Sequence, residues 1–132
     1  MIGIDTNVLV RYLAQDDPVQ AQAATRLIEQ TCTKDNPGFL NHLVLCETIW
    51  VLEGCYGQPK DTLVITIEQI LRVAQLRVDE PQVVWQALED YRNNQADFAD
   101  YLLSRINHSK NCTTTMTFDR QAGKSPIFTL LK

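Results

Sequence analysis

The sequence predicts an α/β protein in which helices cover both faces of a short central parallel sheet. Two observations carry this expectation: most of the chain has the apolar spacing of helices, and at least three strand-like segments are separated by those helices. Strands separated by helices need crossover connections, which favour parallel pairing. With 132 residues, of which 45% are hydrophobic, the chain fits a single domain, residues 1–132, with a proper core.

The elements are expected in the following order. Residues 2–5 form a short strand, and the helical spacing that follows has Thr6 or Asn7 available as its cap. Asp17 as a cap and Pro18 at the first helical position begin a second helix. The remaining elements are a turn at 34–38, helices within 44–57, 60–76, 81–94 and 96–111, a strand and turn at 76–82, a strand at 112–119, and a strand or short helix at 125–132.

Composition excludes several classes of protein. The net charge of −4 argues against a protein that coats nucleic acid, although a nuclease that concentrates carboxylates stays possible. No apolar run is long enough to span a bilayer, and no basic segment precedes an apolar stretch at the N-terminus, so we expect a cytoplasmic protein without membrane association. The cysteines and histidines lack the spacing of zinc ligands.

Three acids occupy positions that need an explanation. Asp5 ends the first strand and Asp119 follows a late one, so both are expected at the sheet edge where ligands of α/β proteins bind. Glu47 is the only charge in "LVLCETIWVL", where a carboxylate without a partner would be costly. Glu47 alternatively shares a polar strip with Thr48 or pairs with an arginine, and Asp119 alternatively caps a turn.

Two further acids occur in "ADFADYLL". Asp97 and Asp100 are three residues apart and therefore share a helix face, where like charges repel. Asp97 alternatively caps the helix, a role that fits Asp100 less well because Asp100 lies one turn inside. A group of carboxylates is stabilised by a divalent cation, and Mg²⁺ prefers oxygen ligands.

The stretches "IDTNVLVRYL", "LCETIWVLEGCYG", "ADFADYLL" and "TTTMTFDRQAGK", in this order, resemble the PIN-domain family and, within it, the VapC-type toxins of toxin–antitoxin pairs. The resemblance covers essentially the whole chain. It implies a PIN-like α/β/α sandwich around a short parallel sheet, and a ribonuclease that depends on Mg²⁺, with Mn²⁺ able to substitute. It also implies a homodimer and a cognate antitoxin whose C-terminal segment covers the active groove.

The resemblance assigns the site residue by residue. The family's four acids match Asp5, Glu47, Asp100 and Asp119, and Asp97 matches an additional acid of the third motif. Direct metal contact is expected from Asp5 and Asp100. Glu47 and Asp119 orient metal-bound waters or a second ion during hydrolysis of an RNA phosphodiester bond.

The backbone of a bound RNA needs basic side chains beside it. The candidates for a basic rim are Arg11, Lys110, Arg120 and Lys124, each of which is otherwise an ordinary surface charge.

One rival to the nuclease function is a receiver-type phosphoacceptor signalling domain, which needs an acidic pair after the first strand and a lysine after a late strand. Neither feature occurs in "IDTN" or "TTTMTFD". The other rival is a catalytically silent binding protein with the PIN fold.

Overall fold

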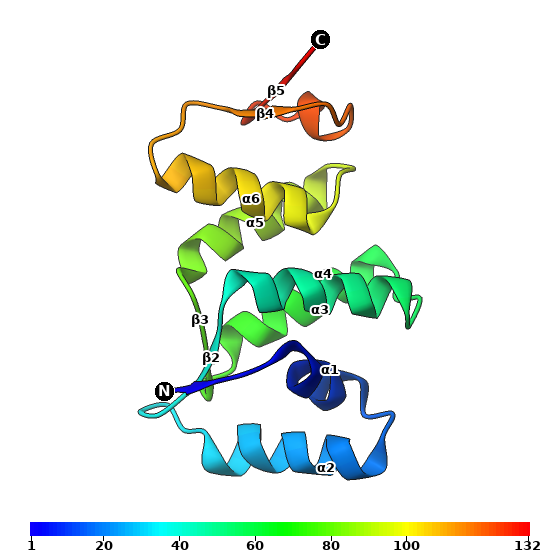
Figure 1. The fold of residues 1–132 in the computed structure, drawn as a ribbon, viewed down its shortest axis with the longest axis vertical. Coiled ribbons are helices and arrows are strands. Elements are labelled where there is room, and N and C mark those ends of the chain that lie inside the picture. Colours follow the sequence, from blue (N-terminus) through cyan, green and yellow to red (C-terminus); the bar gives the residue numbers. More distant parts are fainter. The chain divides into compact units, whose positions relative to one another are not determined.

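The computed structural model describes residues 1–132 and divides into two compact units, Met1–Asp79 and Glu80–Lys132 (Figure 1). Each unit combines helices with short parallel strands, which confirms the α/β class. The strands form a three-stranded sheet in the first unit and a two-stranded sheet in the second. No helix combines the length and the apolar content that crossing a bilayer requires.

The first unit holds the N-terminal strand and four helices. Its elements are β1 (Ile2–Gly3), α1 (Thr6–Ala14), α2 (Pro18–Arg26), a π-helical turn (Leu27–Thr31), β2 (Gly38–Leu40), α3 (His42–Gly54), α4 (Lys60–Arg72) and β3 (Leu76–Val78). Strand β2 lies between β1 and β3 and runs parallel to both. The sequence did not predict β2, which has only three residues and begins inside the predicted turn.

Gly38 is required at the centre of this sheet. Its register partners are Ile2 on β1 and Leu76 on β3. A Cβ atom at Gly38 would lie 2.9 Å from Cγ1 of Ile4 and 3.1 Å from Cδ2 of Leu76. The apolar side chains of the neighbouring segments therefore fill the space that any other residue would need.

Short polar side chains cap two helices of the first unit, α2 and α3. Asp17 Oδ1 accepts hydrogen bonds from the backbone N–H groups of Val19 (3.1 Å) and Gln20 (3.0 Å), directly before Pro18 at the first position of α2. This confirms the predicted start of that helix. Asn41 plays the same part for α3, where its Oδ1 accepts from the backbone of Val44 at 2.9 Å.

The core of the first unit is apolar and comes from helices far apart in sequence. Helix α1 packs against α2 and α3, and α3 packs against α4. Eight side chains of these helices, of β2 and of the π-helical turn are at most 1% exposed. They are Leu9, Ile28, Leu40, Leu45, Leu52, Leu63 and Ile67, together with the polar Thr48. The buried apolar side chains therefore line the faces along which these helices pack.

The second unit pairs two helices with a small sheet. Its elements are α5 (Pro81–Asn93), α6 (Phe98–Ser109), β4 (Thr115–Thr117), a 3₁₀ turn (Ala122–Lys124) and β5 (Phe128–Leu130). Strands β4 and β5 are parallel, with Thr115 opposite Phe128, so the last predicted segment is a strand. Helices α5 and α6 pack together, and Arg105 of α6 forms two hydrogen bonds with Asp90 of α5, at 2.6 and 2.8 Å.

Candidate functional site

Asp5 follows β1 and occupies the cap position of α1. Its backbone is extended, its side chain makes no capping hydrogen bond, and the residue is exposed. The cap position is therefore Asp5, which precedes both Thr6 and Asn7, the two caps that the sequence suggested. Because the carboxylate of Asp5 is not used to cap the helix, both of its oxygens are available to a ligand.

Glu47 has a partner that explains its place in an apolar helix. Thr6 Oγ1, at the start of α1, donates a hydrogen bond of 2.8 Å to Glu47 Oε1 on α3. Thr6 is buried and Glu47 is half-buried. The alternative of an arginine partner is wrong. A polar strip shared with Thr48 is also wrong, because Thr48 is 0% exposed and its hydroxyl has no hydrogen-bond partner.

In the second unit, Asp97 and Asp100 lie at the start of α6. Asp97 occupies the cap position and is exposed, as the sequence allowed. Its backbone N–H donates to Oδ2 of Asp100 at 3.2 Å, which is the return half of a capping box. Asp100 therefore also has a structural role at the start of this helix, which we did not predict from the sequence.

Asp100 lies among like charges. Burial raises the pKa of its carboxyl, and the negative charges of Asp97 and Asp119 raise that pKa further. The hydrogen bond from the backbone of Asp97 opposes these effects and lowers it. The structure therefore brings Asp97 and Asp119 within electrostatic range of Asp100, and a nearby cation would relieve the repulsion.

Asp119 follows β4 and caps the next turn. Its Oδ1 accepts from the backbone N–H groups of Gln121 (2.8 Å) and Ala122 (3.0 Å), where the 3₁₀ turn begins. The capping alternative for Asp119 is therefore correct, and the residue is also exposed. The second oxygen of the carboxylate takes no part in this cap and is available to a ligand.

The donor set of the five acids fits a hard cation. Asp5 and Glu47 belong to the first unit, and Asp97, Asp100 and Asp119 to the second. Within neither unit do three His, Cys, Asp or Glu side chains meet as a ready metal site. Carboxylate oxygens suit Mg²⁺ or Mn²⁺ better than Zn²⁺. The expectation that Asp5 and Asp119 lie at the edge of one sheet is wrong, because β1 belongs to the three-stranded sheet and β4 to the two-stranded sheet.

The histidine and cysteine side chains nearest to these acids in sequence are poorly placed or poorly suited to bind a metal. His42 Nε2 is engaged at 2.7 Å with the backbone carbonyl of Asp79. Cys46 precedes Glu47 on α3, and burial together with the charge of Glu47 raises the pKa of its thiol to about 11. A thiol with that pKa is protonated at neutral pH and is a poor metal ligand.

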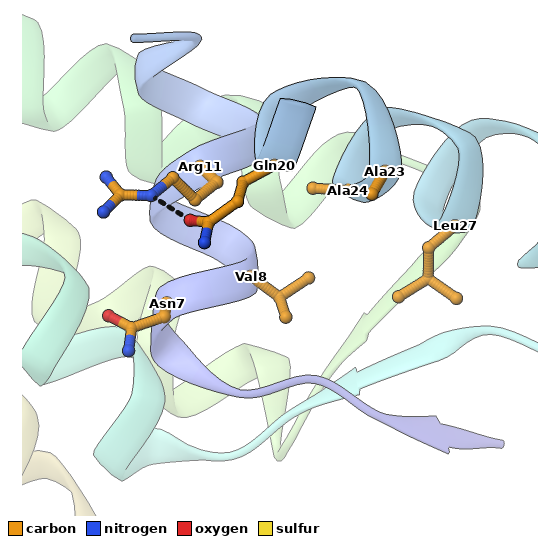
Figure 2. Close-up of a pocket in the computed structure, with 7 residues that line it drawn as sticks. All are labelled: Asn7, Val8, Arg11, Gln20, Ala23, Ala24 and Leu27. Atoms are coloured by element: carbon orange, nitrogen blue, oxygen red, sulfur yellow. Dashed lines mark hydrogen bonds between the residues drawn. The ribbon is translucent and has the colours of Figure 1, made fainter. Parts of the chain in front are cut away.

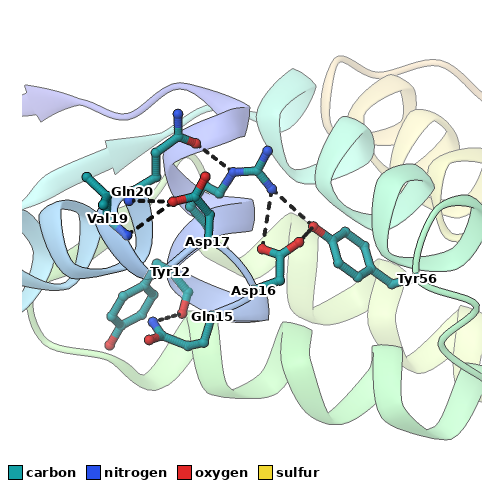
Figure 3. A network of polar contacts seen from close by, with 8 residues as sticks. Tyr12, Gln15, Asp16, Asp17, Val19, Gln20 and Tyr56 are labelled. Carbon is teal, nitrogen blue, oxygen red and sulfur yellow. Dashed lines mark hydrogen bonds and ion pairs between the residues drawn. The ribbon is translucent and has the colours of Figure 1, made fainter.

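Arg11 is held by a polar network that the sequence did not reveal. Its Nε donates to Gln20 Oε1 at 2.7 Å (Figure 2). Its Nη1 donates to Tyr56 Oη at 3.1 Å and to Asp16 Oδ1 at 3.4 Å. Tyr56 in turn donates to Asp16 Oδ2 at 2.6 Å (Figure 3). The guanidinium is thus fixed by groups up to 45 residues away in sequence.

The other predicted basic residues lie in the second unit. Lys110 occupies the cap position at the end of α6, and Arg120 and Lys124 flank the turn that Asp119 caps. All three are exposed. A role in RNA binding stays a prediction for each of these residues.

A comparison with protein families found one match. The model of the PIN domain family matches residues 2–124 and therefore runs through both units. This match confirms the predicted PIN-like α/β/α fold. No curated protein and no solved structure matched the chain.

Proposed function

Because the chain belongs to the PIN domain family, we propose that it is a metal-dependent endoribonuclease that hydrolyses RNA phosphodiester bonds with Mg²⁺, for which Mn²⁺ can substitute. PIN domains are generally metal-dependent nucleases. The observation that carries the proposal is the match of the PIN domain family model to residues 2–124. Five acids at positions that the family uses supply the oxygen donors that a divalent cation prefers.

The proposal assigns a role to each acid. Asp5 and Asp100 hold the metal, directly or through water. Glu47 and Asp119 orient waters at the metal, and Asp97 adds negative charge beside Asp100. A bound Mg²⁺ would supply hydroxide at neutral pH and stabilise the charge that develops on the phosphate oxygens. The hydrogen bond from Thr6 fixes the direction of the Glu47 carboxylate, and the backbone bonds to Asp100 and Asp119 fix theirs.

The finer proposal concerns the biological role. The resemblance of four stretches of the chain to VapC-type toxins supports a toxin that is neutralised by a cognate antitoxin, and that acts as a homodimer in the cytoplasm. The family match removes the support for the receiver-type alternative, since that domain belongs to another fold family. A catalytically silent PIN-fold protein is the remaining rival, and activity separates it from the nuclease.

The test is cleavage of RNA by the purified chain, free of any antitoxin. We expect cleavage with Mg²⁺ or Mn²⁺ that stops when EDTA is added. Cleavage that persists in EDTA, or that returns with Zn²⁺ alone, would contradict the assigned metal and ligands. A complete lack of cleavage under these conditions would favour the silent binding protein.

Two variants of α6 separate capping from catalysis. Asparagine caps a helix about as well as aspartate does, but it lacks the charge that a metal ligand needs. Asp97→Asn should keep the fold and much of the cleavage rate, whereas Asp100→Asn should keep the fold and lose most of it at any Mg²⁺ concentration. The measurement is the initial cleavage rate against Mg²⁺ concentration. Near-normal rates for Asp100→Asn would show that its charge is not used.

A further inference from the structure

A cavity of about 320 Å³ lies between α1 and α2 in the first unit (Figure 2). Its apolar wall is formed by Val8 of α1, by Ala23 and Ala24 of α2, and by Leu27 at the start of the π-helical turn. The two alanines leave room that larger side chains would fill. The volume lies at the lower end of the range for small-molecule sites, about 300–1,000 Å³.

The other end of the cavity is rich in hydrogen-bond donors. Asn7, Arg11 and Gln20 line it, and Figure 2 shows their polar groups gathered on one side of Val8. Oε1 of Gln20 already accepts a hydrogen bond from Arg11 Nε, and Nη1 of Arg11 already donates to Asp16 and Tyr56.

These bonds leave Nε2 of Gln20, Nη2 of Arg11 and the amide of Asn7 without a protein partner. Two of the three free groups are donors only, and the third can also donate. Because the network of Tyr56 and Asp16 already fixes the guanidinium, a ligand would lose little side-chain freedom on binding (Figure 3).

We propose that this cavity binds an unpaired base of the RNA substrate. The ring lies on the apolar wall, and acceptor atoms of the base edge face Arg11 and Gln20. Single-stranded RNA is recognised through unstacked bases that contact apolar or planar groups and are read at their edges. The inference rests on the proposed function, and it makes α1 serve both chemistry and recognition, because Asp5 directly precedes the helix that carries Asn7 and Arg11.

Donor-rich surroundings favour particular bases. Guanine presents O6 and N7 as adjacent acceptors, whereas adenine pairs the N7 acceptor with an amino donor. The cavity should therefore bind guanine more tightly than adenine. The proposed cleavage would then favour RNA with guanine at a fixed position relative to the cut.

The test is a nuclear magnetic resonance titration of the chain with GMP and with AMP in EDTA, so that neither metal nor cleavage takes part. Gln20→Leu removes one donor and should weaken GMP binding about three- to tenfold, the equivalent of one hydrogen bond. Gln22→Leu is the matched control, because Gln22 is exposed on the same helix and does not line the cavity. It should leave binding unchanged.

A second variant tests the cavity independently, in case Gln20→Leu disturbs folding. Ala23 is exposed, so Ala23→Leu should fill the cavity and reduce GMP binding at least tenfold without disturbing the core. Resonance shifts confined to residues outside α1 and α2, tighter binding of AMP, or unchanged affinity in both variants would overturn the proposal. A chain that cleaves RNA yet fails this test refutes the base site alone, and one that binds GMP here without cleaving RNA refutes the nuclease alone.

Discussion

Replacing Thr6 with valine tests whether the Thr6 hydroxyl holds the carboxylate of Glu47. The two groups are 2.8 Å apart, and they connect the start of α1 with α3 across 41 residues of sequence. Valine keeps the branched shape of threonine and removes only the donor. Thr6 is only 9% exposed, so little water reaches position 6 to replace the lost hydrogen bond. Glu47 is half-buried, so its carboxylate keeps some access to water.

The size of the effect follows from this geometry. A hydrogen bond to a charged group contributes about 1.5–3 kcal/mol to stability, and the access of Glu47 to water places this bond at the lower end, about 1.5 kcal/mol. For 132 residues, an unfolding entropy of about 2.1 cal/mol/K per residue converts this loss into a drop in Tm of roughly 5 °C. Threonine and valine have similar helix propensities, so α1 itself contributes little to the difference.

The assay is a double-mutant cycle measured by urea denaturation, followed by circular dichroism without metal. In the parent background, Thr6→Val should destabilise the chain. In a Glu47→Ala background the same change should be neutral or stabilising, because it then removes a buried hydroxyl that has no partner. An equal loss of stability in both backgrounds would refute the reasoning, since Thr6 would then stabilise the fold through its packing alone.

Two further predictions concern groups outside the proposed chemistry. Asp90→Asn weakens the pair that Asp90 (14% exposed) forms with Arg105 (23% exposed) through two hydrogen bonds, and should lower the free energy of unfolding in urea by about 2 kcal/mol. Glu89→Gln changes the exposed pair with Arg92 and should lower that free energy by less than about 0.5 kcal/mol. Similar losses for both variants would contradict the burial argument. The thiol of Cys46, with a pKa of about 11, should be roughly 0.1% thiolate at pH 8 and should resist iodoacetamide in the folded chain, and rapid alkylation detected by mass spectrometry would contradict that pKa.

The sequence predicted the helices of this fold well because each helix carries its own signals. The period of apolar residues and the Asp17–Pro18 start are local features, and the structure confirms both. Strand β2 was missed because it has three residues and begins with Gly38, a residue depleted in strands. Its glycine is explained only by the side chains of Ile4 and Leu76, which no local pattern reveals.

The same distinction applies to the candidate site. The five acids could be selected from sequence, but the partner of Glu47 could not, since Thr6 lies 41 residues away and the bond depends on how α1 packs against α3. The network around Arg11 was missed for the same reason. The role of Asp100 at the start of α6 had a local signal, because an acid three residues after a cap is the pattern of a capping box.

That structural role does not compete with the proposed role of Asp100 at a metal. A carboxylate has two oxygens and about four lone-pair directions, and the backbone of Asp97 uses one of them, at Oδ2. The bond fixes the rotation of the side chain and leaves Oδ1 to bind a cation. Asp119 follows the same pattern, since both backbone bonds go to its Oδ1. Capping therefore orients these acids in advance. An amide at either position can keep the cap but cannot supply the charge, so preserved stability with lost cleavage would identify the charge as the functional property.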